Sequence, residues 1–177
     1  MHQKDFTFMS NSSAVRVALV HPSQWTEITD AAPTETIVRI EAADLREGQQ
    51  ARARARAEAV EAGKDADSVA VFLDIEIHIA DDARTARREF AALDAPTVPG
   101  SIRYVGTPSG LAGLIADVKA ADVADGVTLL PVGPTSRNLD RVADGVVPWL
   151  EDRGVVFAAD AVLEGAGVAR RSRVLAS

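Results

Sequence analysis

Hydrophobic and polar positions change their spacing several times along the chain, and five short runs have the pattern of strands. These runs are rich in β-branched residues or alternate between apolar and polar side chains, as a half-buried strand does. Val69–Ile79 is the longest and clearest of them. The runs cover residues 15–21, 36–41, 69–79, 102–106 and 126–131.

The segments between these runs predict helices. Ala and Arg alternate at residues 51–57 with a strand-like period, but both are strong helix formers and poor strand formers. Arg52, Arg54 and Arg56 spread around such a helix, which favours a solvated helix over an anion site. The expected helices cover residues 24–32, 43–62, 82–93, 107–121 and 135–153, the last of them bent near Pro148. The helices are expected to start at, in chain order, Ser23, Asp81 or Asp82, Thr107 followed by Pro108, and Thr135. Gly63 is expected to end the helix over residues 43–62.

The alternation of strands and helices predicts an α/β fold with parallel strands and right-handed crossovers. Residues 1–13 are polar and aperiodic, and we expect a flexible N-terminal tail there. Residues 14–177 are expected to form a single domain, with one more helical turn towards Ser177. The composition is that of an ordinary globular protein, with 47% hydrophobic and 25% charged residues.

Charge and cysteine usage narrow the classes of partner. The formal net charge is −7, so nucleic acid and anionic membrane surfaces would repel the protein as a whole. The chain has no cysteine, which excludes disulfides, thiolate metal sites and cysteine nucleophiles. No signal-peptide core or membrane-spanning stretch is visible. We therefore expect a cytoplasmic protein that binds neither nucleic acid nor membrane.

Three polar side chains share one face of the longest expected strand. Asp74, Glu76 and His78 alternate with apolar residues, so they point away from the side that should meet helices. Such a set could hold a divalent cation or transfer protons. However, neighbours along one strand face are ~7 Å apart, which is wide for ligands of one ion. An ion-paired or solvated sheet face is the favoured interpretation, and no metal motif is visible.

Several local patterns in the second half of the chain resemble the C-terminal half of the luciferase-like monooxygenases. They include Val105-Gly106-Thr107-Pro108 before a helix and Ala124-Asp125-Gly126-Val127 at the start of a strand. Leu129-Leu130-Pro131, Val146-Val147-Pro148-Trp149-Leu150 and Arg153-Gly154 follow in the same order. A weaker match covers residues 17–40.

The resemblance implies a partial (β/α) TIM-barrel-like fold, with about four parallel strands and helices packed mainly on one face. A complete TIM barrel typically needs about 250 residues, so we expect the first half of the barrel to be absent. The four main strands would then correspond to barrel strands five to eight. We call this arrangement a half-barrel.

The family resemblance also implies a flavin cofactor, either reduced FMN or a deazaflavin. Chemistry in TIM barrels occurs at the carboxyl ends of the strands. Candidate catalytic residues are His21, at the end of the first strand, and Asp74, Glu76 and His78, on the polar face of the longest strand. Candidate cofactor-binding residues are Ser23, Thr135, Ser136 and Arg137. Relatives commonly have a Gly- and Ser-rich turn followed by Gly-Arg, whereas residues 21–28 here lack the glycines and the arginine.

Two functions are consistent with these features. The first is a flavin-dependent oxidoreductase or a subunit of one, in which the cofactor carries the chemistry. The second is a non-catalytic half-barrel without a cofactor, which binds another polypeptide. Its polar sheet face would then associate with a second copy or with a complementary half-barrel protein.

Overall fold

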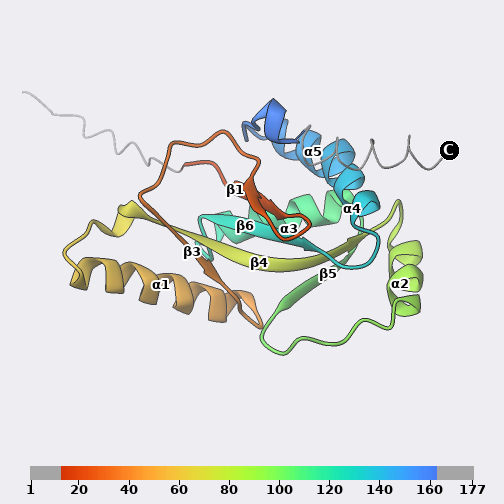
Figure 1. Cartoon of the computed structure of the whole chain (residues 1–177), viewed down its shortest axis with the longest axis horizontal. Coiled ribbons are helices and arrows are strands. Elements are labelled where there is room, and N and C mark those ends of the chain that lie inside the picture. Colours follow the sequence, from red (N-terminus) through yellow and green to blue (C-terminus); the bar gives the residue numbers. More distant parts are fainter. Residues whose placement is uncertain (1–12, 163–177) are drawn as a thin grey trace, which may run out of the picture.

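The computed structural model describes residues 13–162, and six strands form its central sheet. Figure 1 shows the sheet as a curled layer running through the middle of the molecule. The strands are β1 (Arg16–Val20), β2 (Trp25–Glu27), β3 (Thr36–Ile40), β4 (Val69–Ile79), β5 (Ile102–Gly106) and β6 (Gly126–Pro131). The helices are α1 (Leu45–Glu61), α2 (Ala83–Ala92), α3 (Pro108–Ala120), α4 (Thr135–Arg141) and α5 (Val147–Glu151), with a 3-10 turn η1 (Ala66–Ser68) and a π-helical turn η2 (Val142–Val146).

The sheet has the order β2-β1-β6-β4-β3, and β5 also pairs with β4. All pairings are parallel except that of β1 with β2. β3 runs along residues 69–73 of β4, and β5 runs along residues 75–79. The five strands expected from the sequence are all present, and the α/β half-barrel is confirmed.

The position of β1 differs from the expected barrel numbering. Four consecutive barrel strands would place β1 beside β3, but β1 pairs with β6 instead. In a closed parallel barrel the last strand lies beside the first, so β1 has the position of a first strand. The physical reason is the connection, because a parallel neighbour requires a crossover of a dozen or more residues, usually a helix, and β1 and β3 are not joined by one.

The helix expected at residues 24–32 is wrong. Trp25–Glu27 is instead a strand, β2, which pairs antiparallel with β1. Trp25 and Thr26 favour extended backbone, and Ile28 is buried in the core next to it. Ser23 is exposed and caps no helix. The apolar residues of this segment are therefore used by the sheet.

One face of the sheet carries the main core. Leu73, Ile75, Ile77 and Ile79 of β4 are fully buried there, and α3, η2 and α5 pack on the same face. α1 covers the part of this face near β3 and the start of β4. We call this the outer face, and we call the opposite one, which carries Phe72 and Asp74, the inner face.

The expected helix over residues 135–153 is divided into α4, η2 and α5. Pro148 has no N–H to donate within the helix, and the π-helical turn η2 lies just before it. The interruption expected near Pro148 is present, as the π-helical turn η2. Thr135 is not the N-cap, because Pro134 occupies that position without a side-chain capping bond.

Other boundaries agree with the sequence. α2 begins after Asp82, whose carboxylate accepts the Thr85 N–H, and α3 begins after Thr107, whose hydroxyl accepts the Gly110 N–H. Gly63 follows α1 with a positive φ of 78°. The expected tail lies outside the described residues except for Ser13, and of the last expected turn only residues 159–162 are described. Within residues 13–162 no helix is long and apolar enough to cross a membrane.

Candidate functional site

The three polar residues of β4 lie on the inner face, as the alternation predicts, but each contacts a different element. Asp74 bonds to β3, Glu76 to β5, and His78 to the segment after β6 and to α2. Within residues 13–162 no group of three His, Asp or Glu side chains is arranged to hold a metal ion. The structure therefore does not bring these three together into one centre.

Asp74 forms a two-point ion pair with Arg39 on the neighbouring strand β3. The Arg39 Nε donates to Oδ1 at 3.0 Å, and Nη2 donates to Oδ2 at 2.6 Å. The hydrogen bond with Asp74 raises the pKa of Arg39 above its ordinary value, against the opposing effect of burial. This bidentate geometry is the strongest form of the Arg–carboxylate pair. It occupies both oxygens of Asp74.

Glu76 forms an ion pair with Arg103 of β5 through one carboxylate oxygen. The Arg103 Nε donates to the Glu76 carboxylate at 2.8 Å, and Nη2 donates to the Pro96 carbonyl at 2.6 Å. The guanidinium also lies over the Phe90 ring of α2, 5.0 Å from its centroid. Arg103 thus connects the sheet, the loop before β5 and α2.

His78 is buried, with 4% of its surface exposed. Its Nδ1 is 3.0 Å from the Val132 carbonyl, so this nitrogen carries a hydrogen and donates. Its Nε2 is 3.3 Å from a Glu89 carboxylate oxygen, which is also an acceptor. His78 is therefore held by the chain on both ring nitrogens.

The β1–β2 hairpin covers another part of the inner face. The Trp25 Nε1 donates to the Thr128 hydroxyl at 3.0 Å, and its ring packs edge-on against Phe72 at 5.3 Å. The Arg16 guanidinium lies over the Phe72 ring, 5.2 Å from the ring centroid. Arg16 is itself buried and forms a bidentate pair with Glu27. Side chains of this chain thus fill the surface that would be the inside of a barrel.

The candidate cofactor-binding residues lie after two adjacent strands. His21 and Ser23 follow β1, and residues 135–137 follow β6, so both turns lie at the carboxyl edge of the sheet. The His21 backbone N–H donates to the Gln24 carbonyl, while its Nδ1 is buried without a hydrogen-bond partner among the described residues. Ser23 is exposed. Their roles remain predictions.

The turn after β6 does not have the features of a phosphate site. Gly133 is exposed and has a positive φ of 83°, and a Cβ there would lie 2.6 Å from a methyl group of Leu93. Pro134 has no N–H to offer an anion. Thr135 directs its hydroxyl to the Gly133 carbonyl at 3.5 Å, and Arg137 is exposed. The Thr135 hydroxyl is therefore engaged within the turn, and the cofactor-binding roles of residues 135–137 stay predictions.

Two polar residues of α4 that sequence reasoning missed hold the end of β4. Asn138 is 1% exposed; its Oδ1 accepts the Ile79 N–H at 2.9 Å, and its Nδ2 donates to the Val132 carbonyl at 3.2 Å. Arg141 donates to the Ile79 carbonyl at 2.8 Å. In the sequence, the only signal for this role is an Asn next to the apolar Leu139, within an expected helix.

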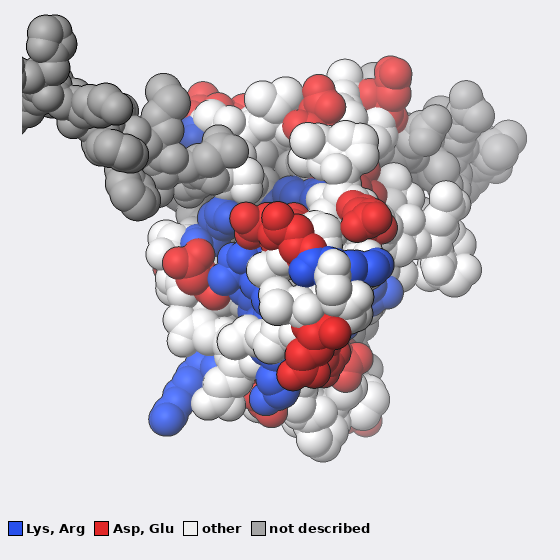
Figure 2. All heavy atoms as spheres, turned by 90° about the vertical axis from the view of Figure 1, so that its left-hand side faces the viewer, with Lys and Arg blue, Asp and Glu red and all other residues white. Residues whose placement is uncertain are grey.

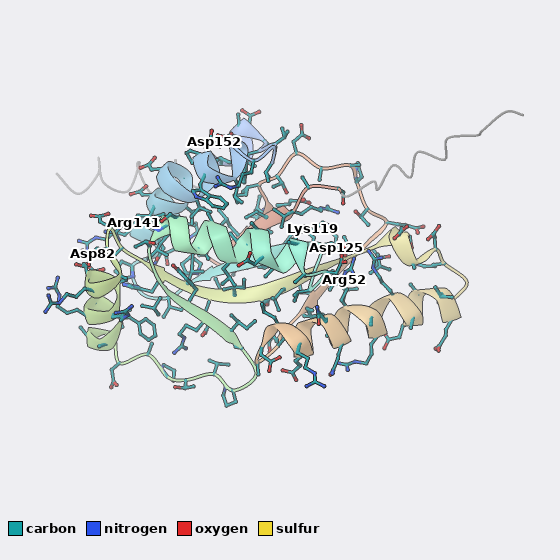
Figure 3. All side chains as sticks on the ribbon, turned by 180° about the vertical axis from the view of Figure 1, so that it is seen from behind. Arg52, Asp82, Lys119, Asp125, Arg141 and Asp152 are labelled. Atoms are coloured by element: carbon teal, nitrogen blue, oxygen red, sulfur yellow. The ribbon has the colours of Figure 1, made fainter. Side chains whose placement is uncertain are left out.

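A second polar cluster centres on Asp125, just before β6. Its Oδ1 accepts from Arg52 at 3.0 Å and from Arg56 at 3.2 Å, and its Oδ2 accepts the Val71 N–H at 2.9 Å. Figure 3 shows Arg52 and Lys119 on either side of this carboxylate. Burial alone would raise the pKa of Asp125, but the Arg52 and Val71 hydrogen bonds and the two arginine charges together lower it.

This cluster explains one of the motifs found in the sequence. Asp125 ties α1 to the starts of β4 and β6, and its carbonyl also accepts the Arg16 N–H. The residue after Asp125 is a glycine because there is no room for a side chain: a Cβ on Gly126 would lie 2.7 Å from both the Arg16 carbonyl oxygen and the Phe72 ring. The Ala-Asp-Gly-Val segment is therefore a structural junction at the amino ends of the strands.

A pocket of about 410 Å³ also lies at the amino ends of the strands. It is lined by the start of β1, residues 29–35, the end of η1 and residues 154–156. Figure 2 views this side of the molecule, where basic and acidic side chains are interspersed. Barrel chemistry occurs at the opposite, carboxyl ends, so this pocket is not where a barrel active site would be.

Comparison with known proteins supports the fold. No protein-family model and no curated protein sequence matches the chain. Among solved structures, long-chain alkane monooxygenase (LadA) is similar with a TM-score of 0.58 and 15% identity, over 73% of this chain and 40% of that one. EDTA monooxygenase (EmoA) from Chelativorans sp. BNC1 is similar with a TM-score of 0.55 and 20% identity, over 74% and 44%.

Riboflavin lyase (RcaE), whose structure holds modified FMN and riboflavin, is similar over 93% of this chain and 55% of its own, with a TM-score of 0.57 and 16% identity. The chain thus spans only about half the length of these proteins or less. At such low identity the likeness establishes the fold alone. The chain has the fold of part of a luciferase-like monooxygenase barrel, as its sequence motifs indicated.

Proposed function

We propose that this chain keeps the luciferase-like fold as a module that binds another polypeptide, and that it does not carry out flavin chemistry by itself. One observation carries the proposal: the polar side chains of the inner face are occupied by contacts within the chain. Asp74 is ion-paired with Arg39, and Glu76 is ion-paired with Arg103. His78 is hydrogen-bonded to the segment after β6. Because each of the three contacts a different element, they do not converge on one point where a substrate or cofactor could react.

The covering of the inner face supports the same conclusion. Trp25 packs on Phe72 and bonds to Thr128, and Phe90 of α2 lies against His78 with ring centroids 5.9 Å apart. A flavin ring bound against this face would have to displace these side chains. At the turn after β6, Pro134 has no N–H to offer a phosphate, and the Thr135 hydroxyl is directed to the Gly133 carbonyl.

Binding of another polypeptide follows from the open sheet. The chain covers 40% of one similar enzyme and 55% of another, and within the described residues β3 ends the sheet without a further strand on its free side. An unpaired strand edge offers backbone N–H and C=O groups to another chain. The absence of cysteine is consistent with a cytoplasmic location for such a module.

A visible spectrum of the purified protein, followed by titration with FMN and with a deazaflavin, tests the proposal. We expect no flavin absorbance and no saturable change in flavin fluorescence, while a flavin-binding protein titrated in parallel saturates. A Trp25→Ala variant, which uncovers Phe72, is the matched comparison for access to the inner face. Stoichiometric binding by the wild-type chain would refute the proposal.

A second candidate is a subunit of a flavin enzyme, because the similar structures include two monooxygenases and a lyase with modified FMN. In that case a partner polypeptide supplies the rest of the barrel and the flavin site. Saturable FMN binding that occurs only after co-expression with such a partner would favour this candidate over the first.

A further inference from the structure

We infer that β3 is a homodimer interface, at which the strand pairs antiparallel with β3 of a second copy and joins two sheets into one. This inference specifies the partner in the proposed binding function and rests on it. Among residues 13–162, β3 pairs only with β4 and is the last strand in the sheet order. Its free edge is therefore available to another strand.

The side chains of β3 make this edge unusual for an unpaired strand. Ile37 is 39% exposed on the inner face, where it lies beside Ala70 of β4. Native edge strands commonly carry charges, Pro or a bulge where they would otherwise pair with another chain. β3 has regular parallel pairing through all five residues and an exposed apolar side chain at its second position, and its one charged residue, Arg39, is paired with Asp74 of the same chain. Such an edge is typical of a pairing surface.

Charge selects the register of the pairing. A two-fold axis requires antiparallel strands, and centring it on Ile37 places Glu35 opposite Arg39 of the other copy, twice. Glu35 is exposed and has no ion-pair partner among the described residues. Arg39 uses Nε and Nη2 for Asp74, which leaves Nη1 for a second carboxylate. Opposite charges facing each other across strands stabilise a sheet.

Other registers are less favourable. Centring the axis on Val38 would place Glu35 opposite Glu41 of the other copy, and like charges directly opposite destabilise a sheet. It would also put Ile37 opposite Arg39 and leave the apolar side chain without an apolar partner. The sequence of β3 is therefore self-complementary about Ile37, which argues for a second copy over an unrelated strand.

Sedimentation equilibrium of the full chain tests the dimer. We expect twice the monomer mass of 18.7 kDa for the wild type. Glu35→Lys turns both facing pairs into like-charge pairs and should raise the dimer dissociation constant about 10- to 100-fold. Glu151→Lys makes the same charge change at an exposed position of α5, away from β3, and should leave the dissociation constant unchanged.

Cross-linking tests the register. The chain has no cysteine, so Ile37→Cys provides a single thiol that faces its own copy within disulfide distance. Mild oxidation should give a covalent dimer, whereas Val156→Cys, exposed elsewhere, should not. A monomeric wild type, or a dimer that I37C does not trap, overturns the interface. If the protein is a monomer and binds no flavin, the dimer interface is refuted but the proposed lack of flavin chemistry is not. If the protein is a dimer and binds FMN, the proposed lack of flavin chemistry is refuted but the dimer interface is not.

Discussion

Replacing Asp125 by Ala tests whether the junction between α1, β4 and β6 depends on this one carboxylate. The variant removes three hydrogen bonds at once, from Arg52, Arg56 and the Val71 N–H. It leaves the Val71 amide buried without its acceptor and two arginines without their shared counter-ion. The side chain is 12% exposed, so water replaces the carboxylate poorly.

Hydrogen bonds to a charged group contribute about 1.5–3 kcal/mol each when buried. The guanidinium groups of Arg52 and Arg56 are partly exposed, at 16% and 26%, and regain some hydration in the variant. We therefore expect Asp125→Ala to lower the free energy of unfolding by about 2–4 kcal/mol at pH 7. Asp67→Ala is the control: its side chain is 84% exposed and 3.1 Å from Arg56, so about 0.5 kcal/mol or less should be lost.

The effect should also depend on pH, because the folded protein lowers the pKa of Asp125 below its ordinary value of 3.8. A lowered pKa means that the stabilisation is fully present above about pH 4 and is lost as the pH falls through the folded value. Urea unfolding of wild type and variant at pH 7, 5 and 3 measures this difference. A loss below about 0.5 kcal/mol at pH 7, or a gap that widens towards pH 3, would refute the reasoning.

Two further substitutions probe the remaining contacts between strands. Gly126→Ala should lower the free energy of unfolding by about 1–3 kcal/mol, because the new methyl group lies 2.7 Å from the Arg16 carbonyl; Gly113→Ala, where the added group meets nothing, is the control in thermal unfolding. Asn138→Leu leaves the buried Ile79 N–H without an acceptor and should cost about 1–3 kcal/mol. For Asn138→Leu, hydrogen exchange should accelerate at the Ile79 amide, and unchanged exchange there would contradict the assignment.

The strands were largely predictable because their apolar residues follow a period of two and are bounded by Pro, Gly or Asp. Val69–Ile79 is the clearest case, since alternation correctly separated its buried outer face from the polar inner face. Residues 24–32 were not predictable in the same way. The extended conformation of Trp25 is stabilised by Phe72 and Thr128, which are distant in sequence, and local propensity carries no information about them.

The candidate site was less predictable than the fold. Alternation showed that Asp74, Glu76 and His78 share a face, but not which partners would reach them. Arg39 and Arg103 lie on strands that neighbour β4 in space, and their pairing depends on register. The role of Asn138 depends on where α4 begins, which the expected cap at Thr135 placed incorrectly.

The pairing of β1 with β6 has a consequence for synthesis of the protein on the ribosome. Trp25 and its hydrogen-bond partner Thr128 are 103 positions apart in the sequence. At 5–20 residues per second, the N-terminal hairpin must wait on the order of 5–20 s for its neighbour to be made. During that time the apolar face of β1 is without its native cover, and contacts this distant in sequence also form slowly. A nascent chain of this protein is therefore expected to need chaperone protection at its beginning until its last strand has emerged.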